Sequence, residues 1–223
     1  MIKCVLVDND GVLVNTEQLY FLATKEILQA CGVELSLQCY IDNCMRASRG
    51  VWHLLSERGC PEGEISCAKN ARDALYLEYI TTRDISLPGA REFLVSLRKS
   101  CRICVVTSSK RIHFDRIHQV TGFSPLFDHT LTIEDYAECK PSPVPYLTGL
   151  ALLGTDGSDA AAIEDSERGL RAAHAAGLRC IVVPNELTMN QDFRNAWQVL
   201  PDLQAASAFL APLVARTALP GVP

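Results

Sequence analysis

Short runs of apolar residues, separated by segments with helical spacing, constrain the fold of this 223-residue chain more than any other feature. The runs are continuous rather than alternating, as expected for parallel strands that are covered on both faces. The expected strands are Ile2–Val7, Arg102–Thr107, Thr130–Ile133, Ala160–Glu164 and Cys180–Val183. Because parallel strands joined by helices require right-handed crossovers, the alternation predicts an α/β fold with a doubly wound, Rossmann-like parallel sheet.

Three segments between these strands have the apolar spacing of helices that cover a sheet. They are Arg91–Lys99, Pro143–Leu153 and Glu167–Ala176, and Gly177 follows the last as a C-cap. Each lies next to an expected strand in the sequence, so each is expected to serve as a crossover or flanking helix of the core.

One long interval between the first expected strand and Arg91 contains no good strand. Helical spacing occurs instead in Thr16–Cys31, around Val51–Leu55 and in Ile65–Ile80. A crossover needs only about a dozen residues. The interval therefore predicts an inserted α-helical cap at residues 16–86, above the carboxyl edge of the sheet, with residues 1–15 and 87–223 as the core.

Composition excludes several classes of protein. The 48% share of apolar residues excludes a disordered chain, and a net charge of −5 without a basic stripe argues against a nucleic-acid partner. No apolar run is long enough to span a bilayer, so no membrane partner is expected. The first residues lack a secretory pattern, and the ten cysteines are interpreted as free thiols, so we expect a cytoplasmic protein. Oligomeric state is not predicted.

Charged and hydroxyl side chains stand where the expected strands end. In chain order they are Asp8, Asp10, Thr107, Lys140, Glu164 and Asp165. Ligands of open α/β sheets bind at this edge, and converging carboxylates repel one another unless a cation lies between them. A hard divalent ion with oxygen ligands, Mg²⁺, suits such a set, so the pattern predicts a magnesium site.

The same motifs resemble those of the haloacid dehalogenase superfamily, in its phosphatase and phosphomutase branch. The resemblance rests on DNDGVLVNTE at 8–17, VVTSSK at 105–110, KPSPVPYL at 140–147 and IEDSERGLRAAHAAG at 163–177. It covers nearly the whole chain and is greatest to phosphoglycolate phosphatases and β-phosphoglucomutases. That family carries a helical cap between its first two motifs, where the insert is expected.

The resemblance implies a phosphoric monoester hydrolase that acts through an aspartyl-phosphate. Asp8 would be the nucleophile, and Asp10 would protonate the leaving oxygen and later deprotonate water. Phosphate oxygens would be bound by Thr107 and by the amides of Ser108 and Ser109. The expected substrate is a small phosphorylated metabolite, such as a sugar phosphate or a phosphoglycolate-like compound.

The remaining motifs imply the charge balance of the site. Lys140 would offset negative charge on the phosphate and on the nucleophile. Glu164 and Asp165 would bind Mg²⁺ or orient its ligands. The ion itself is expected on the carboxylates of Asp8 and Asp165 and on the backbone carbonyl of Asp10.

A few positions leave the interpretation open. Arg46 and Arg49 share a helical face, and Arg49 matches an arginine of the mutase cap; it either binds a distal anionic group or is a solvated surface residue. His113 and His118 are expected to be packing or surface residues. Asn9 departs from the family pattern, in which an apolar or aromatic residue is commoner, and its side chain should face away from the site.

Three alternatives were weighed against a phosphatase. A dehalogenase lacks the acid found here at Asp10, and a receiver-type phospho-accepting switch has its motifs in a different order. A β-phosphoglucomutase-like phosphomutase is closer, since it shares most motifs. Its cap histidine and lysine, however, fall on Tyr20 and Met45 in this chain, and tyrosine does not change charge near pH 7 as histidine does. A phosphatase reaction is therefore favoured over a phosphomutase reaction on a sugar phosphate.

Overall fold

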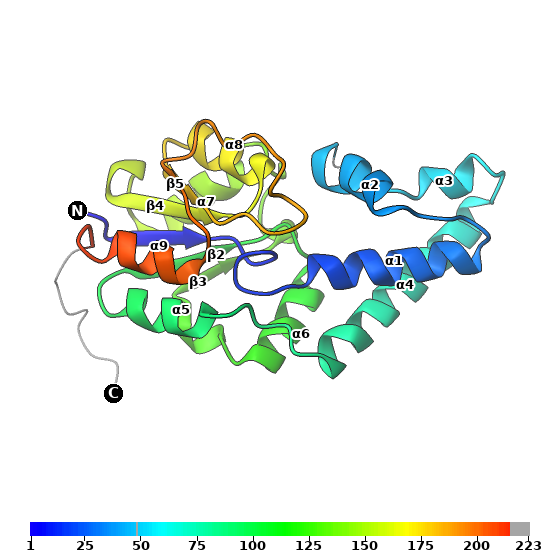
Figure 1. Ribbon diagram of the computed structural model, residues 1–223, viewed down its shortest axis with the longest axis horizontal. Coiled ribbons are helices and arrows are strands. Elements are labelled where there is room, and N and C mark those ends of the chain that lie inside the picture. The colour runs from blue at the N-terminus through cyan, green and yellow to red at the C-terminus, as the bar shows by residue number, and fades with distance from the viewer. Residues whose placement is uncertain (48, 215–223) are drawn as a thin grey trace. The chain divides into compact units, whose positions relative to one another are not determined.

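The computed structural model describes residues 1–47 and 49–214 (Figure 1). The chain divides into two compact units. The first consists of Met1–Asn15 together with the chain from Ser86 onward, and the second is Thr16–Ile85.

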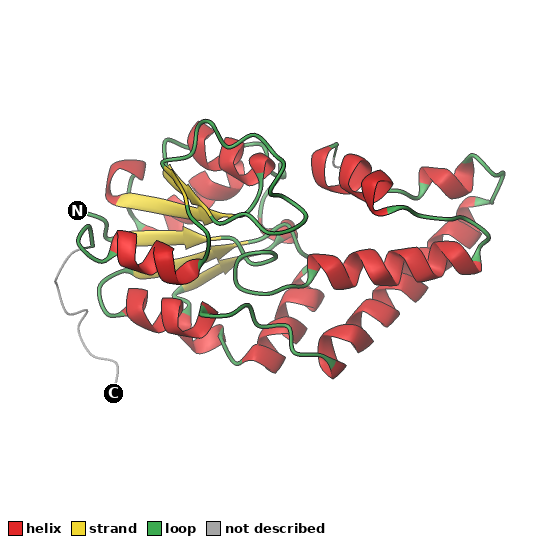
Figure 2. Cartoon of the chain, in the orientation of Figure 1, coloured by secondary structure: helices red, strands yellow, loops and turns green. Residues whose placement is uncertain are grey.

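The first unit is built on a parallel sheet of six strands (yellow in Figure 2). The strands are β1 (Cys4–Val7), β2 (Arg102–Val106), β3 (His129–Leu131), β4 (Ala160–Glu164), β5 (Arg179–Val182) and β6 (Gln198–Val199). Their order is β3-β2-β1-β4-β5-β6, and Val7 of the central β1 lies opposite Val105 and Ile163. The predicted fold class is confirmed, and the five expected strands lie within two residues of the observed bounds; β6 was not predicted.

Helices cover both faces of this sheet. They are α5 (Ala90–Arg98), α6 (Arg111–Thr121), α7 (Val144–Leu153), α8 (Glu167–Ala175) and α9 (Leu203–Leu210). Helices α7 and α8 share one apolar core with side chains of the strands, including Leu6 and Val182. Helices α5 and α9 contact each other and lie on the opposite face (Figure 1). Short 3-10 turns occur at Ser124–Leu126, Ile133–Asp135 and Gly157–Asp159.

The regular elements among the described residues of the second unit are all helical. It contains α1 (Glu17–Ala30), α2 (Leu37–Tyr40), a π-helical turn (Ile41–Arg46), α3 (His53–Ser56) and α4 (Glu62–Thr82). The two long helices, α1 and α4, contact each other, and one apolar cluster includes Phe21 of α1, Tyr40 of α2 and Leu55 of α3. The predicted helices correspond to α1, α3 and α4, whereas α2 and the π-helical turn were not predicted.

Of the residues that the structure describes, none form a helix long and apolar enough to cross a membrane.

Candidate active site

Asp8 follows directly on the last residue of β1 and is held at the carboxyl edge of the sheet. Its backbone N–H donates to the carbonyl of Ile163 on β4 at 2.9 Å. The chain then turns sharply at Gly11, whose φ of +83° favours glycine. A Cβ atom at Gly11 would lie 2.2 Å from Oδ2 of Asp165, so this turn also leaves the space that the second acidic motif occupies.

Lys140 occupies the centre of the site. Its Nζ donates to Oδ1 of Asp8 at 2.7 Å, to Oε1 of Glu164 at 2.7 Å and to the carbonyl of Val106 at 2.9 Å. Burial alone would lower the pKa of Lys140, but the adjacent carboxylates of Asp8 and Glu164 raise it above its usual range. The lysine is therefore charged, and its three donors fix it between the two carboxylates.

Glu164 ends β4 and is enclosed by its partners. Besides Lys140, the hydroxyl of Tyr146 on α7 donates to its Oε1 at 2.6 Å, and the Tyr146 ring centroid lies 5.1 Å from the lysine Nζ. On α8, a Cβ at Gly169 would lie within about 2 Å of the Glu164 carboxyl group. Glycine at this position lets the first turn of α8 approach the glutamate, so the carboxylate is positioned from both sides.

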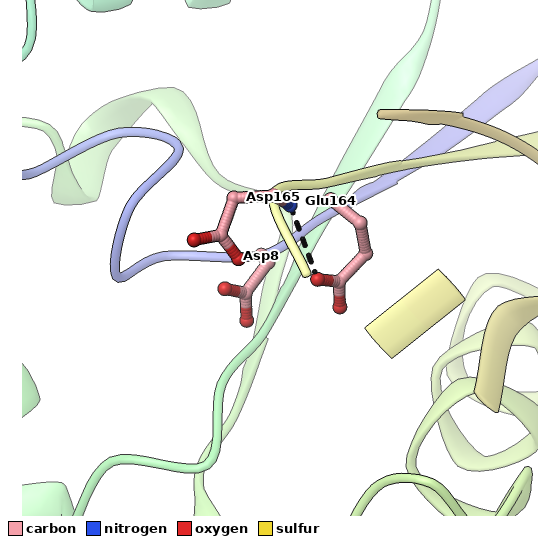
Figure 3. Close-up of side chains that lie close together, drawn as sticks. All are labelled: Asp8, Glu164 and Asp165. Atoms are coloured by element: carbon pink, nitrogen blue, oxygen red, sulfur yellow. Dashed lines mark hydrogen bonds between the residues drawn. The ribbon is translucent and has the colours of Figure 1, made fainter. Parts of the chain in front are cut away.

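Three carboxylates lie close together at this edge of the sheet (Figure 3). Asp8, Glu164 and Asp165 each offer a ligand oxygen, and these oxygens lie within 4.8 Å of one another. Burial raises the pKa of Asp8 to about 7; Lys140 opposes this shift, and the charges of Glu164 and Asp10 add to it. Crowded, buried carboxylate oxygens are the donor set that a hard divalent cation binds, and such an ion would lower the pKa of Asp8 again.

Asp165 is oriented by a residue that the sequence analysis did not single out. Asn185, three residues beyond β5, donates from Nδ2 to Oδ2 of Asp165 at 2.7 Å. The Asn185 side chain is itself fixed, because its Oδ1 accepts the N–H of Leu187 at 2.9 Å. Its place just past a strand end, at the edge that carries the acidic motifs, was a signal that could have identified it.

Asp10 lies in a separate set of hydroxyl donors. Its Oδ2 accepts from Oγ1 of Thr107 at 2.9 Å and from Oγ of Ser109 at 2.8 Å. The N–H of Ser109 in turn donates to Oγ1 of Thr107 at 3.0 Å. Ser108 Oγ is buried and makes no hydrogen bond among the described residues. The turn after β2 thus orients the second aspartate as well as presenting polar groups at the sheet edge.

Within the first unit, the structure brings most of the expected site residues together in two clusters. Asp8, Lys140, Glu164 and Asp165 form one cluster, and Asp10, Thr107 and Ser109 form the other. Arg49 belongs to the second unit, where its guanidinium donates to Oδ1 of Asn43. Arg46 in the same unit pairs with Asp42 at 2.9 Å.

In the sequence analysis, Tyr146 is placed only within the expected helix Pro143–Leu153 and is assigned no role. Its hydroxyl contact with Glu164 depends on how α7 packs, which helical spacing does not predict.

The second unit holds a buried cation that the sequence analysis did not single out. The guanidinium carbon of Arg72 lies 4.0 Å from the ring centroid of Tyr20 and 5.3 Å from that of Trp52. Its Nε donates to Oδ1 of Asp73 at 2.8 Å. Burial raises the pKa of Tyr20 to about 12, so its phenol is neutral near pH 7.

A family model described as haloacid dehalogenase-like hydrolase matches residues 2–177, which include every motif described above. The chain belongs to this family. It is 30% identical to Protein CbbY of Rhodobacter capsulatus, over 95% of this chain and 98% of that protein. It is 26% identical to hexitol phosphatase B of Escherichia coli, over 82% of this chain and 84% of that protein.

The fold agrees with a solved relative. The structure of CbbY from Rhodobacter sphaeroides in complex with phosphate superposes with a TM-score of 0.78 at 27% identity, covering 91% of this chain and 95% of that one. A mutant of the same protein, matched equally well, was solved in complex with xylulose-1,5-bisphosphate. These matches confirm the predicted family and the prediction of a phosphoric monoester hydrolase.

Proposed function

We propose that this protein is a magnesium-dependent phosphatase that hydrolyses a small phosphorylated metabolite through an aspartyl-phosphate on Asp8. The observation that carries the proposal is the contact of the Lys140 ammonium with Asp8 at 2.7 Å, within a buried cluster of carboxylates. A lysine held in this way favours the ionised form of the nucleophile against the effect of burial, and it offsets the charge of an approaching phosphate. Such positioning and charge stabilisation account for most of the catalysis of phosphoryl transfer.

In the first step a carboxylate oxygen of Asp8 attacks phosphorus, and the bond between phosphorus and the leaving oxygen breaks. Asp10 donates its proton to that oxygen as it leaves as an alcohol. In the second step Asp10 takes a proton from water, the water oxygen attacks phosphorus, and the bond from phosphorus to Asp8 breaks. Inorganic phosphate is released, and both aspartates return to their starting states.

The donors around Asp10 support its role as the acid and base. Two hydroxyl groups, from Thr107 and Ser109, hold one oxygen of this carboxyl group. Proton transfer requires a carboxyl group in a defined orientation, and these contacts supply it. The buried Ser108 hydroxyl and the Ser108 amide are the groups that we assign to phosphate oxygens, since the Ser109 amide donates to Thr107.

The residues present fit a magnesium ion. The ligands would be the carboxylates of Asp8, Glu164 and Asp165 and the carbonyl of Asp10. When bound, the ion would neutralise charge on the carboxylates and on the phosphate. Asn185 would keep Asp165 turned toward it.

We assign the substrate to the class of phosphorylated sugars and sugar alcohols. Support comes from the relatives, one of which is a hexitol phosphatase while another was solved with a sugar bisphosphate. A phosphatase is favoured over a phosphomutase because of Tyr20, which stands at the position of the mutase histidine. Burial raises the pKa of Tyr20 to about 12, and its ring packs against Tyr76 with centroids 5.0 Å apart. It cannot serve as a group that titrates near pH 7.

We further propose that the second unit acts as the substrate-selecting cap and that Arg49 binds an anionic group distant from the transferred phosphate. Arg49→Ala should then raise KM for the preferred sugar phosphate and spare a small aryl phosphate. Equal losses on the two substrates would assign Arg49 a structural role.

The test of the function is phosphate release across a panel of hexose, pentose and hexitol phosphates, sugar bisphosphates and phosphoglycolate, with Mg²⁺ present. We expect steady turnover on at least one sugar phosphate, and none by Asp8→Asn. Intact-mass measurement after rapid acid quench should detect the phosphoenzyme in the wild type only. If β-glucose 1-phosphate with a bisphosphate primer yields glucose 6-phosphate faster than inorganic phosphate, the protein is a mutase instead.

A further inference from the structure

The residue between the two aspartates, Asn9, is completely buried and connects Asp10 to a histidine on another element. Its Nδ2 donates to Oδ2 of Asp10 at 3.3 Å. Its Oδ1 lies 2.9 Å from Nε2 of His118, which is on α6. The side chain was expected to face away from the site, but its amide nitrogen donates to Asp10, the proposed acid and base, while its oxygen is directed at the histidine.

The bonding pattern defines the protonation of His118. A carboxylate oxygen accepts only, so the amide group of Asn9 must direct its nitrogen to Asp10 and its oxygen to the histidine. Nε2 of His118 must then carry the hydrogen. Its Nδ1 lies 3.1 Å from Oγ1 of Thr121, and this hydroxyl donates to the unprotonated ring nitrogen. A continuous chain of donors therefore runs from Thr121 through His118 and Asn9 to Asp10.

Aromatic packing fixes the imidazole in place. His118 is only 2% exposed, and its ring centroid lies 4.3 Å from that of Phe114 and 5.0 Å from that of Phe127. Burial lowers the pKa of His118 to about 4, although the charge of Asp10 opposes the shift. The imidazole is neutral at physiological pH and has one donor, which it directs at Asn9.

We propose that Asn9 and His118 are positioning residues for Asp10, and that they hold its carboxyl group in the orientation needed to protonate the leaving oxygen. The proposal rests on the proposed function, because it assigns Asp10 the role of acid and base. Three donors, from Asn9, Thr107 and Ser109, converge on the same oxygen of Asp10. With Oδ2 held in this way, Oδ1 is the oxygen assigned to exchange the proton.

The proposal predicts a dependence on the leaving group that a merely structural role would not produce. The leaving group of an alkyl phosphate is a strongly basic alkoxide, so its departure needs a positioned acid. The leaving group of 4-nitrophenyl phosphate is the weakly basic 4-nitrophenolate, which departs without one. The comparison uses kcat/KM, because it reports only on steps up to release of the leaving group. Dephosphorylation, which needs Asp10 with either substrate, does not enter it.

The first variant removes the central amide. Asn9→Leu retains the volume and should lower kcat/KM on a hexitol phosphate about 10- to 100-fold, the effect expected for losing a hydrogen bond to a charged group. On 4-nitrophenyl phosphate the loss should stay below about threefold. Equal losses on both substrates would overturn the proposal and leave the proposed function standing.

Two variants at His118 test the histidine. Glutamine can place its Nε2 near the Nε2 of histidine, so His118→Gln should recover most of the alkyl phosphate activity that His118→Leu loses. Ile117→Val is the matched control, since Ile117 is the buried neighbour on the same helix. It should reduce thermal stability without changing the ratio of the two kcat/KM values. Failure of His118→Gln to exceed His118→Leu, with both variants folded, would contradict the role of the histidine.

A measurement that does not depend on turnover separates the positioning role of Asn9 and His118 from the proposed phosphatase function. In ¹⁵N NMR spectra of the full chain, His118 should be the neutral tautomer protonated at Nε2, and Asn9→Leu should shift its resonances. A tautomer protonated at Nδ1 would overturn the chain of donors. If the wild type releases no phosphate from any substrate, the proposed function fails, and the tautomer still shows whether the contacts exist.

Discussion

Each unit of the molecule contains a buried cation, and the two are bound in opposite ways. Lys140 in the first unit and Arg72 in the second are 4% and 5% exposed. Lys140 donates to two carboxylates and a carbonyl, all at the edge of the sheet. Arg72 lies against the rings of Tyr20 and Trp52 and pairs with one carboxylate, that of Asp73.

The difference separates a cation that takes part in chemistry from one that holds helices together. Lys140 is outnumbered by carboxylates, so its surroundings still favour a further cation and an incoming phosphate. Arg72 has its charge matched by Asp73, and its planar face contributes packing between α1 and α4. Burial of a cation alone therefore does not identify a site; the groups to which it donates do.

The largest effect should come from removing the carboxylate that Lys140 holds. Asp8→Asn should abolish turnover, because no nucleophile remains. It should also change the pH dependence of stability. Since the pKa of Asp8 rises from 3.8 to about 7 on folding, the wild type without metal loses stability as pH rises through this window. Thermal melts in chelator should show that the melting temperature of the variant rises relative to that of the wild type between about pH 4 and pH 7, and the opposite trend would contradict the raised pKa.

Removing divalent ions should have almost as large an effect on rate. Turnover should vanish in excess chelator and return with Mg²⁺, whereas Ca²⁺ should inhibit, because it prefers more ligands in looser geometry. Mg²⁺ should also raise the melting temperature of the wild type, since it binds only the folded carboxylate cluster. Asp165→Ala should weaken this response. Full turnover in chelator would contradict the assigned metal site.

Replacing Lys140, the buried cation of the first unit, should strongly reduce the turnover rate. Lys140→Met should lower kcat on the order of 10²-fold, as for the loss of one electrostatic clamp. Because Lys140 opposes the rise in the pKa of Asp8, its loss should move the acidic limb of the pH–rate profile to higher pH. A rate profile is the measurement, and an unshifted acidic limb would show that the lysine does not act through Asp8.

Replacing Arg72, the buried cation of the second unit, by methionine should have the smallest effect on the turnover rate. Arg72→Met should cost about 1–3 kcal/mol of folding stability, from the lost ring contacts and the lost hydrogen bond to Asp73. Turnover of 4-nitrophenyl phosphate should stay within about twofold of the wild type. Denaturant unfolding and steady-state kinetics would check both values. A rate loss comparable to that of Lys140→Met would remove the distinction between the two cations.

The sheet and its acidic edge could be predicted because both depend on short-range patterns. Strands β1, β2, β4 and β5 contain continuous, largely buried apolar runs, and motifs that end such runs must meet at one edge. Strand β6 was missed because Gln198 and Val199 are a two-residue strand with both side chains exposed. Helix α2 was missed because it has only four residues, too few to show helical spacing. It begins at a side-chain cap, in which the Oγ of Ser36 accepts from the N–H of Cys39.

Side-chain orientation was the other limit of the sequence analysis. Thr107 was expected to bind phosphate, whereas its hydroxyl donates to Asp10 in this structure. The contacts of Tyr146, Asn185 and His118 also depend on packing between elements far apart in the chain. A motif indicates that a polar group reaches the sheet edge, but the group it contacts there is decided by neighbouring side chains.

The match to the family ends at residue 177, two residues before β5 begins, and this boundary has a consequence for truncated forms of the protein. A fragment that ended there would retain each aspartate, the lysine and the glutamate. It would nevertheless lose the strand that pairs with β4 through Ala161–Glu164, and the amide that orients Asp165. A fully buried strand left with unpaired backbone groups is a template for aggregation. A gene product with a complete set of signature motifs could thus be both inactive and insoluble, so a count of motifs would misclassify it as an enzyme.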